Sequence, residues 1–219
     1  MAKANKCPRC KVNIEFCFCA ALEKVETKTA VDVIMHFKEL NLTSNTANLI
    51  ELSFNQAKVH VRGLENNRLD VSTIFRAGYT PIYLFPLENS RPLTREAILE
   101  LNQPIQLIMP DGSWRQARKV IDREKILQTI PCFSLRDMPP TQYKLRREHF
   151  ADGMSTFEAC YYALCIIEGT EKMAPAWRNF TTMVEHNLKE RGQLSYKKST
   201  AGPRRLTAGA LESDKGPIG

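Results

Sequence analysis

The feature that most constrains the fold is a short apolar run that passes directly into a helix near the middle of the chain. Residues 105–109 are almost wholly apolar, as in a parallel strand that is buried on both faces. Pro110 and Gly112 end this run, and the next residues place Ala117 and Val120 on one side of a helix. A strand that leads at once into a helix is the building unit of parallel α/β sheets.

The same alternation extends along most of the 219 residues. Further strand-like runs lie at residues 31–35, 58–61, 81–85 and 132–135, and helical runs are predicted near 44–53, 94–101, 114–128, 156–168 and 176–190. The hydrophobic fraction of 43% is sufficient for one sizeable core. The sequence therefore predicts an α/β fold with a mostly parallel sheet, in one main domain with appendages.

Polar and aromatic side chains follow the run at 105–109. Asp111, Ser113 and Trp114 stand where the strand ends, and ligands of open α/β sheets bind at that end of the strands. Two interpretations of this junction stay open from the local pattern. Asp111 could merely cap the helix and Trp114 could anchor it in the core, or these side chains could belong to a ligand site.

Two close cysteine pairs lie at the beginning of the chain. Cys7 and Cys10 form one pair, and Cys17 and Cys19 form the other. A disulfide or unrelated cysteines would be alternatives, but two pairs within thirteen residues favour a tetrahedral four-thiolate zinc site. The total of seven cysteines also suits reduced thiols plus a metal site better than a disulfide framework.

Four motifs in order make the chain resemble the DTW-domain family of tRNA-uridine aminocarboxypropyltransferases. They are the cysteine pairs, His36-x-x-Glu39 followed by Asn45-Thr46, Asp111-Gly112-Ser113-Trp114-Arg115-Gln116-Ala117, and Ser155-Thr156-Phe157-Glu158-Ala159. The resemblance spans roughly residues 7 to 185. Three departures are visible: Ser113 stands where Thr is usual, Ala47 stands where Gly is usual, and Asn41 and Leu42 lie where a basic residue is common.

The resemblance implies a fold that periodicity cannot reveal. It is a SPOUT-like α/β domain with a C-terminal trefoil knot, which we expect over residues 25–191. A zinc-binding module of four cysteines would precede it at residues 1–24, and a basic, disordered tail would follow at 192–219.

The resemblance also implies the chemistry. It implies transfer of the 3-amino-3-carboxypropyl group of S-adenosylmethionine to N3 of a tRNA uridine, at variable-loop position 47 as in bacterial members, with release of methylthioadenosine. The expected cofactors are S-adenosylmethionine, as co-substrate, and zinc. A SPOUT-like methyltransferase and a non-catalytic zinc RNA-binding module are the alternative functions.

Individual residues can be assigned to this chemistry. Asp111 is the predicted base for the N3 proton, with Ser113 and Trp114 as its catalytic neighbours. A helix N-terminus at 155–156 would suit the cofactor's carboxylate, although Ser155 and Glu158 also read as a plain capping box. The strand end at 84–86 would supply the floor of an adenine pocket. The full predicted cofactor-binding set is Ser44, Thr46, Phe85, Pro86, Met109, Pro110, Trp114, Ser155 and Thr156.

Positive charge points to a polyanionic partner. The net charge is +7, of which the segment from His186 to the end, with seven Lys or Arg and three Asp or Glu, contributes +4. That segment is either an arm that follows RNA or a solubilising tail. We predict that six basic residues bind RNA, and the alternative is that they only form solvent-exposed charged surfaces. They are Arg115, Arg118, Lys119, Lys144, Arg146 and Arg147.

The chain contains no run of 18 apolar residues, and its first residues carry no apolar signal core. We therefore expect a cytoplasmic protein that binds tRNA, with no membrane association and no obligate protein partner.

Overall fold

A six-stranded parallel sheet organises the computed structural model, which describes residues 5–66, 68–145 and 153–193. Every strand pair in the order β2-β1-β5-β3-β6-β4 is parallel, which confirms the predicted sheet. The strands are β1 (Ala30–His36), β2 (Ala57–Arg62), β3 (Thr80–Leu84), β4 (Arg91–Pro92), β5 (Ile105–Asp111) and β6 (Cys132–Ser134).

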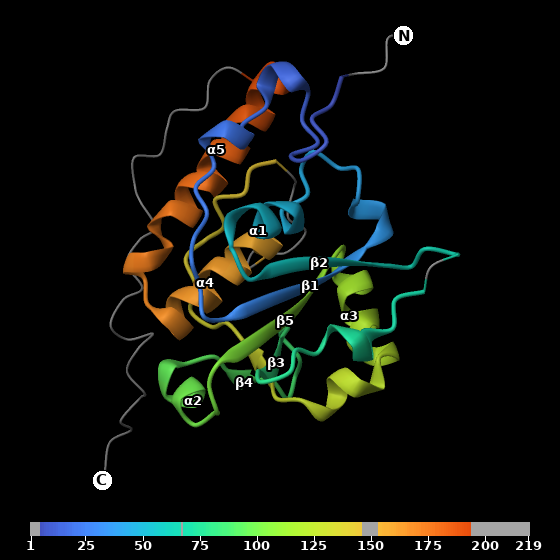
Figure 1. Ribbon diagram of the computed structural model, residues 1–219, viewed down its shortest axis with the longest axis vertical. Helices are drawn as coiled ribbons and strands as arrows, with labels where there is room; N and C mark the ends of the chain where they lie inside the picture. Colours follow the sequence, from blue (N-terminus) through green and yellow to red (C-terminus); the bar gives the residue numbers. More distant parts are fainter. Residues whose placement is uncertain (1–4, 67, 146–152, 194–219) are drawn as a thin grey trace.

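Helices cover both faces of this sheet, as Figure 1 shows. The α-helices are α1 (Ala47–Ser53), α2 (Arg95–Leu99), α3 (Trp114–Arg123), α4 (Thr156–Glu168) and α5 (Ala174–Glu190). The 3-10 helices are η1 (Ile14–Phe16), η2 (Cys19–Ala21), η3 (Phe37–Glu39), η4 (Val71–Ile74), η5 (Lys125–Thr129) and η6 (Glu171–Met173). Helices α1, α4 and α5 pack on one face, and α3 with η4 and η5 packs on the other.

The two helical layers exist because side chains alternate along the central strands. In β5, Leu107 and Met109 join the larger core with α1, α4 and α5, whereas Ile108 joins the smaller core beneath α3. All seven residues of β5 are buried, as expected for a strand with a neighbour on each side and a helix on each face. The strand ends of β1, β5 and β3 consequently lie together at one edge.

The turn from β5 into α3 depends on a glycine. Gly112 has φ +143°, and a Cβ at this position would lie 3.0 Å from Gln116 Oε1 and 3.3 Å from His36 Cβ. Ser113 is the N-cap of α3, and its backbone N–H donates to Gln116 Oε1 at 2.7 Å. The absence of a side chain at Gly112 therefore lets the ends of β1 and β5 approach the first turn of α3.

The N-terminal segment packs against the last helix. The backbone N–H of Asn13 donates to Glu190 at 2.9 Å, and His186 Nδ1 lies 2.9 Å from the carbonyl oxygen of Phe16. Cys7 and Cys10 belong to the same apolar cluster as the core of the main sheet. Figure 1 shows this segment lying along α5.

Some details of the predicted elements differ from the structure. Strand β4 was missed because it consists only of Arg91–Pro92, too short for any period. The helix predicted over 114–128 breaks at Glu124, where ψ of 87° separates α3 from η5. Helix α5 begins at Ala174 instead of 176, with a proline in its first turn.

Part of the predicted domain organisation stays a prediction. The trefoil knot and the boundaries at residues 24 and 191 stay predictions. Arg146, Arg147 and residues 194–219 of the predicted tail lie outside the described residues. Among the helices that are described, none is both long enough and apolar enough to cross a membrane.

Candidate active site

The carboxylate of Asp111 lies at the point where β5 ends beside β1. Met35 of β1 is its partner in register, and only 7% of Asp111 is exposed. Thr156 Oγ1, at the start of α4, donates to Oδ1 of Asp111 at 2.5 Å, and Asn45 Nδ2 donates to Oδ2 at 3.3 Å. A buried carboxylate is thus held between two segments that are distant in sequence. Asp111 does not cap α3, because the N-cap of that helix is Ser113.

Asn45 is itself fixed in orientation. Its amide nitrogen also contacts Met35 Sδ at 3.1 Å and the carbonyl oxygen of Glu39 at 3.2 Å, and its Oδ1 accepts from the backbone N–H of Asn48 at 2.8 Å. The oxygen of the amide is therefore turned toward α1 and the nitrogen toward Asp111. This arrangement explains why an amide, with a donor and an acceptor on one group, occupies the position.

Among the predicted cofactor residues, Thr156 contacts Asp111 directly, Ser155 precedes it, and Ser44 and Thr46 flank Asn45, the other partner of Asp111. Thr46 Oγ1 accepts from the backbone N–H of Phe157 at 3.3 Å, and Tyr143 Oη donates to the carbonyl oxygen of Ser44. The Thr46 bond ties the loop after β1 to the first turn of α4, and the Ser44 bond ties the same loop to the segment after β6. Two predicted groups that are distant in the sequence therefore form one wall of the site.

The capping box at the start of α4 is confirmed. Ser155 Oγ accepts from the backbone N–H of Glu158 at 3.3 Å, and Glu158 Oε2 accepts from the backbone N–H of Ser155 at 2.9 Å. Glu158 also accepts from Thr141 Oγ1 and from the backbone N–H of Gln142, each at 2.7 Å. The backbone N–H groups of Phe157 and Glu158 thus have protein partners already, and Glu158 anchors the segment after β6 to the site.

An aromatic surface forms the other wall. The rings of Trp114 and Phe85 are 5.1 Å apart between centroids, at an interplanar angle of 37°. Trp114 is 54% exposed, so its interpretation as a core anchor was wrong. Pro86 is exposed beside Phe85, while Met109 and Pro110 are buried within β5.

The four N-terminal cysteines form a compact group of metal-ligand type. All four Sγ atoms lie within 4.8 Å of one another, with 3.8 Å between Cys7 and Cys19 and 3.8 Å between Cys10 and Cys17. Tetrahedral zinc with Zn–S bonds of about 2.3 Å requires sulfur atoms about 3.8 Å apart, so the group fits a zinc ion.

The pKa values of these thiols are shifted in opposite directions. Burial raises the pKa of Cys7, but backbone N–H groups of Cys10 and Arg9 outweigh it and lower this pKa to about 6. Burial, reinforced by the Cys10 thiol, raises the pKa of Cys19. A bound cation would stabilise all four as thiolates, the form that ligates zinc.

Comparison with known proteins identifies the family. The family model described as the DTW domain matches residues 4–188, which include both walls of the site and the four cysteines. The chain belongs to the DTW-domain family.

Relatives within this family are distant. A Drosophila melanogaster protein named tRNA-uridine aminocarboxypropyltransferase 2 is 25% identical over 180 residues, which cover 78% of this chain and 70% of the relative. A Macaca fascicularis protein of the same name is 26% identical over 169 residues, which cover 74% of this chain and 56% of the relative. A solved structure, the SAM-dependent rRNA:acp-transferase Tsr3 from Vulcanisaeta distributa, matches with a TM-score of 0.48 and 16% identity, over 75% of this chain and 80% of that chain.

The basic residues of this DTW chain that were predicted to bind RNA divide into two groups. Arg115, Arg118 and Lys119 are exposed on α3, directly after the aromatic wall. Lys144 is exposed in the segment after β6. Arg118 Nε pairs with Asp122 at 3.2 Å within α3, and Lys144 follows Tyr143, whose hydroxyl donates to the carbonyl oxygen of Ser44.

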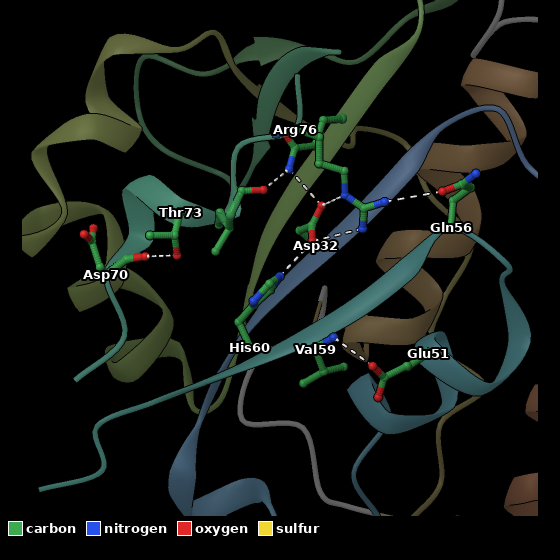
Figure 2. A network of polar contacts seen from close by, with 10 residues as sticks. Asp32, Glu51, Gln56, Val59, His60, Asp70, Thr73 and Arg76 are labelled. Carbon is green, nitrogen blue, oxygen red and sulfur yellow. Dashed lines mark hydrogen bonds and ion pairs between the residues drawn. The ribbon is translucent and has the colours of Figure 1, made fainter. Parts of the chain in front are cut away.

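A second polar cluster of the DTW fold lies on the α3 face of the sheet, and Figure 2 shows it. Asp32 of β1, only 1% exposed, accepts from Arg76 Nε and from Gln106 Nε2, each at 2.8 Å, and pairs with His60 Nε2 at 2.7 Å. Both of its oxygens are satisfied, and Arg76 follows η4. The cluster therefore secures the crossover from β2 to β3 against the sheet.

Sequence reasoning missed the contribution of this cluster and of the segment around Tyr143. Asp32 was read only as part of a strand, and no local pattern indicates that its partners come from β2, β5 and the residue after η4. His36 has a local structural partner: its Nδ1 accepts from the backbone N–H of Lys38 at 3.2 Å, at the start of η3.

Proposed function

We propose that this chain transfers the 3-amino-3-carboxypropyl group of S-adenosylmethionine to N3 of a uridine in tRNA. The observation that carries the proposal is the buried carboxylate of Asp111, held by Thr156 and Asn45 at the carboxyl end of β5. In a parallel sheet this edge is where ligands bind. Membership of the DTW family and the names of its relatives supply the reaction class.

Asp111 has two tasks in this reaction. Uracil N3 carries a proton at neutral pH, so the carboxylate accepts that proton as N3 attacks the γ-carbon of the aminocarboxypropyl group. The new N3–C bond forms while the C–S bond breaks, its electrons return to sulfur, and neutral methylthioadenosine leaves. The same negative charge offsets the sulfonium charge before transfer.

The aromatic wall orients the reactants. The exposed face of Trp114, supported by Phe85, offers a stacking surface for the uracil ring or a cation–π contact for the sulfonium, worth about 1 kcal/mol. Ser113, exposed at the N-cap of α3, is within the same junction and offers a hydroxyl to the uracil carbonyl. The hydroxyls of Ser44, Thr46, Ser155 and Thr156 suit the amino-acid end of S-adenosylmethionine.

The finer assignments belong to the same proposal. The expected product is the N3-modified uridine at variable-loop position 47, as the resemblance of the sequence motifs to bacterial members of the family implies. We place the reaction in the cytoplasm, where seven thiols remain reduced and a four-thiolate site can hold zinc.

Mass spectrometry of tRNA nucleosides, after incubation of tRNA with the protein and labelled S-adenosylmethionine, tests the reaction. The expected product is an aminocarboxypropyl uridine, and methylated uridine would assign the alternative, methyl transfer. The Asp111→Asn variant should lose roughly 10²–10⁴-fold in turnover, the usual contribution of a general base.

The matched control is Glu23→Gln, which removes a carboxylate charge from an exposed ion pair with Arg178 and should leave turnover within about twofold. Higher pH should partly rescue Asp111→Asn, because uracil N3 then loses its proton unaided. A folded Asp111→Asn protein with normal turnover would remove Asp111 from the mechanism.

A further inference from the structure

A hollow of about 380 Å³ lies beside α3, on the face of the sheet that carries the smaller core. Its apolar floor is formed by Ile121, Leu127 and Ile130, and the carboxylate of Asp122, the ion-pair partner of Arg118, also lines it. Its volume falls within the range of roughly 300–1,000 Å³ that small-ligand pockets occupy. Of the residues that were given a role above, only Arg118 lines this hollow.

Two guanidinium groups stand at the rim of this hollow. Arg91 of β4 pairs with Glu100 at 2.9 Å and lies over the ring of Phe133, with Cζ 5.6 Å from the ring centroid. Arg118 of α3 makes the exposed pair with Asp122. Ion pairs as exposed as these stabilise a protein by only about 0–1 kcal/mol, so either guanidinium can exchange its carboxylate for a phosphate.

The hollow continues the aromatic wall of the candidate active site. Arg118 is one helical turn after Trp114, so the two side chains share one face of α3. On the other side, Cys132 lines the hollow and its Sγ lies 3.4 Å from the carbonyl oxygen of Phe85. A chain of nucleotides whose target base stacks on Trp114 would therefore reach this hollow with a neighbouring base.

We propose that the hollow binds a splayed-out base of tRNA next to the modified uridine, with Arg91 and Arg118 contacting the phosphates on either side of it. This inference rests on the proposed function. Single-stranded RNA is recognised by apolar slots that take unstacked bases and by polar groups that contact base edges. The exposed amide of Asn89 at the rim supplies such a group.

The charge at the rim distinguishes RNA from the cofactor as occupant. S-adenosylmethionine carries no phosphate, and its single carboxylate could pair with only one of the two guanidinium groups. A nucleotide inside a polymer has one phosphate on each side. Paired guanidinium groups around an apolar floor therefore favour a base within RNA.

Fluorescence anisotropy with labelled tRNA tests this site in the full-length protein. Arg91→Gln should weaken tRNA binding and lower the slope of log affinity against log salt by about 1, as expected for one lost phosphate contact. Asn89→Trp should fill the hollow from its rim and weaken binding roughly tenfold, within the usual contribution of one bound base. The control is Arg95→Gln, which removes the same charge from an exposed residue of α2 outside the hollow and should change the affinity less than twofold.

Two further measurements make the outcomes separable. Calorimetric titration with S-adenosylmethionine should give the wild-type affinity in both variants, and thermal melting should show that both are folded. Unchanged tRNA affinity in both folded variants, or a loss of S-adenosylmethionine affinity, would overturn the inference. If the wild type makes no aminocarboxypropyl uridine but the variants still lose tRNA affinity, the proposed base-binding hollow is retained and the proposed reaction fails. If the wild type binds no tRNA, both proposals fail.

Discussion

Replacement of Asp32 by Asn removes a buried charge that several elements share. The carboxylate accepts hydrogen bonds from Arg76 at 2.8 and 3.1 Å and from Gln106 at 2.8 Å, and it pairs with His60 at 2.7 Å (Figure 2). Asn keeps one acceptor oxygen, so two donors then face its NH₂ group. Each lost bond to a charged group costs roughly 1.5–3 kcal/mol.

The expected total loss lies near the lower end of that sum. The side chain of Arg76 is 25% exposed, so its guanidinium retains some contact with water after the substitution. We expect the free energy of unfolding to fall by about 3 kcal/mol. For a domain of this size the melting temperature should fall by about 6–12 °C.

The stability lost in Asp32→Asn should become smaller as the pH falls. Burial raises the pKa of Asp32, but the hydrogen bonds from His60, Arg76 and Gln106 outweigh it and hold this pKa below its usual value of 3.8. The depressed pKa contributes stability that is fully present well above pH 3.8 and is lost as the pH falls through the lower, folded-state pKa. The stability difference between wild type and Asp32→Asn should therefore shrink in acid below pH 3.8.

Urea denaturation followed by circular dichroism at neutral and acid pH measures both quantities. The matched control is Glu23→Gln, which removes a carboxylate from an exposed pair with Arg178, where the side chains are 58% and 54% exposed. That control should lose at most about 1 kcal/mol. An Asp32→Asn loss no larger than the control, or a difference that persists unchanged in acid, would refute the reasoning.

Two further predictions concern the metal group and the turn after β5. The paired substitution Cys17→Ser with Cys19→Ser should abolish zinc binding, measured as one zinc per wild-type chain by elemental analysis; retention of a full equivalent would contradict the site. Gly112→Ala should lower the free energy of unfolding by about 1–3 kcal/mol, because its φ of +143° and its contacts of 3.0 and 3.3 Å leave no room for a Cβ. Gly78→Ala is the control, because φ at Gly78 is +81° but nothing lies within 4 Å of the added Cβ. If both variants lose the same free energy of unfolding, the whole effect comes from backbone conformation and not from steric contact.

The strands and helices could be predicted well because their signals are local. The apolar run that became β5 and the capping box Ser155–Glu158 both appear in the structure where the sequence places them. Local signals failed where elements are too short or are interrupted. Strand β4 has two residues, one of them proline, and Glu124 ends α3 within a pattern that reads as one helix.

The candidate site could be predicted only in part, because its contacts are not local. Asp111 is 45 residues from Thr156 and 66 residues from Asn45, and no periodicity connects positions so far apart. The ordered motifs of the DTW family brought these residues into one set before any distance was known. No motif included Arg91, so the hollow beside α3 followed only from the coordinates.

The contact between the N-terminal segment and α5 has a consequence for synthesis of the protein. Asn13 meets Glu190 across 177 positions, and Phe16 meets His186 across 170, so these bonds form only after nearly the whole described chain has been made. The four cysteines lie within thirteen residues and can close around zinc as soon as they emerge. Early metal uptake would then fold the N-terminal segment before α5, the helix on which it packs, has been synthesised. Zinc starvation during translation would therefore delay formation of the core more than removal of zinc by a chelator after synthesis.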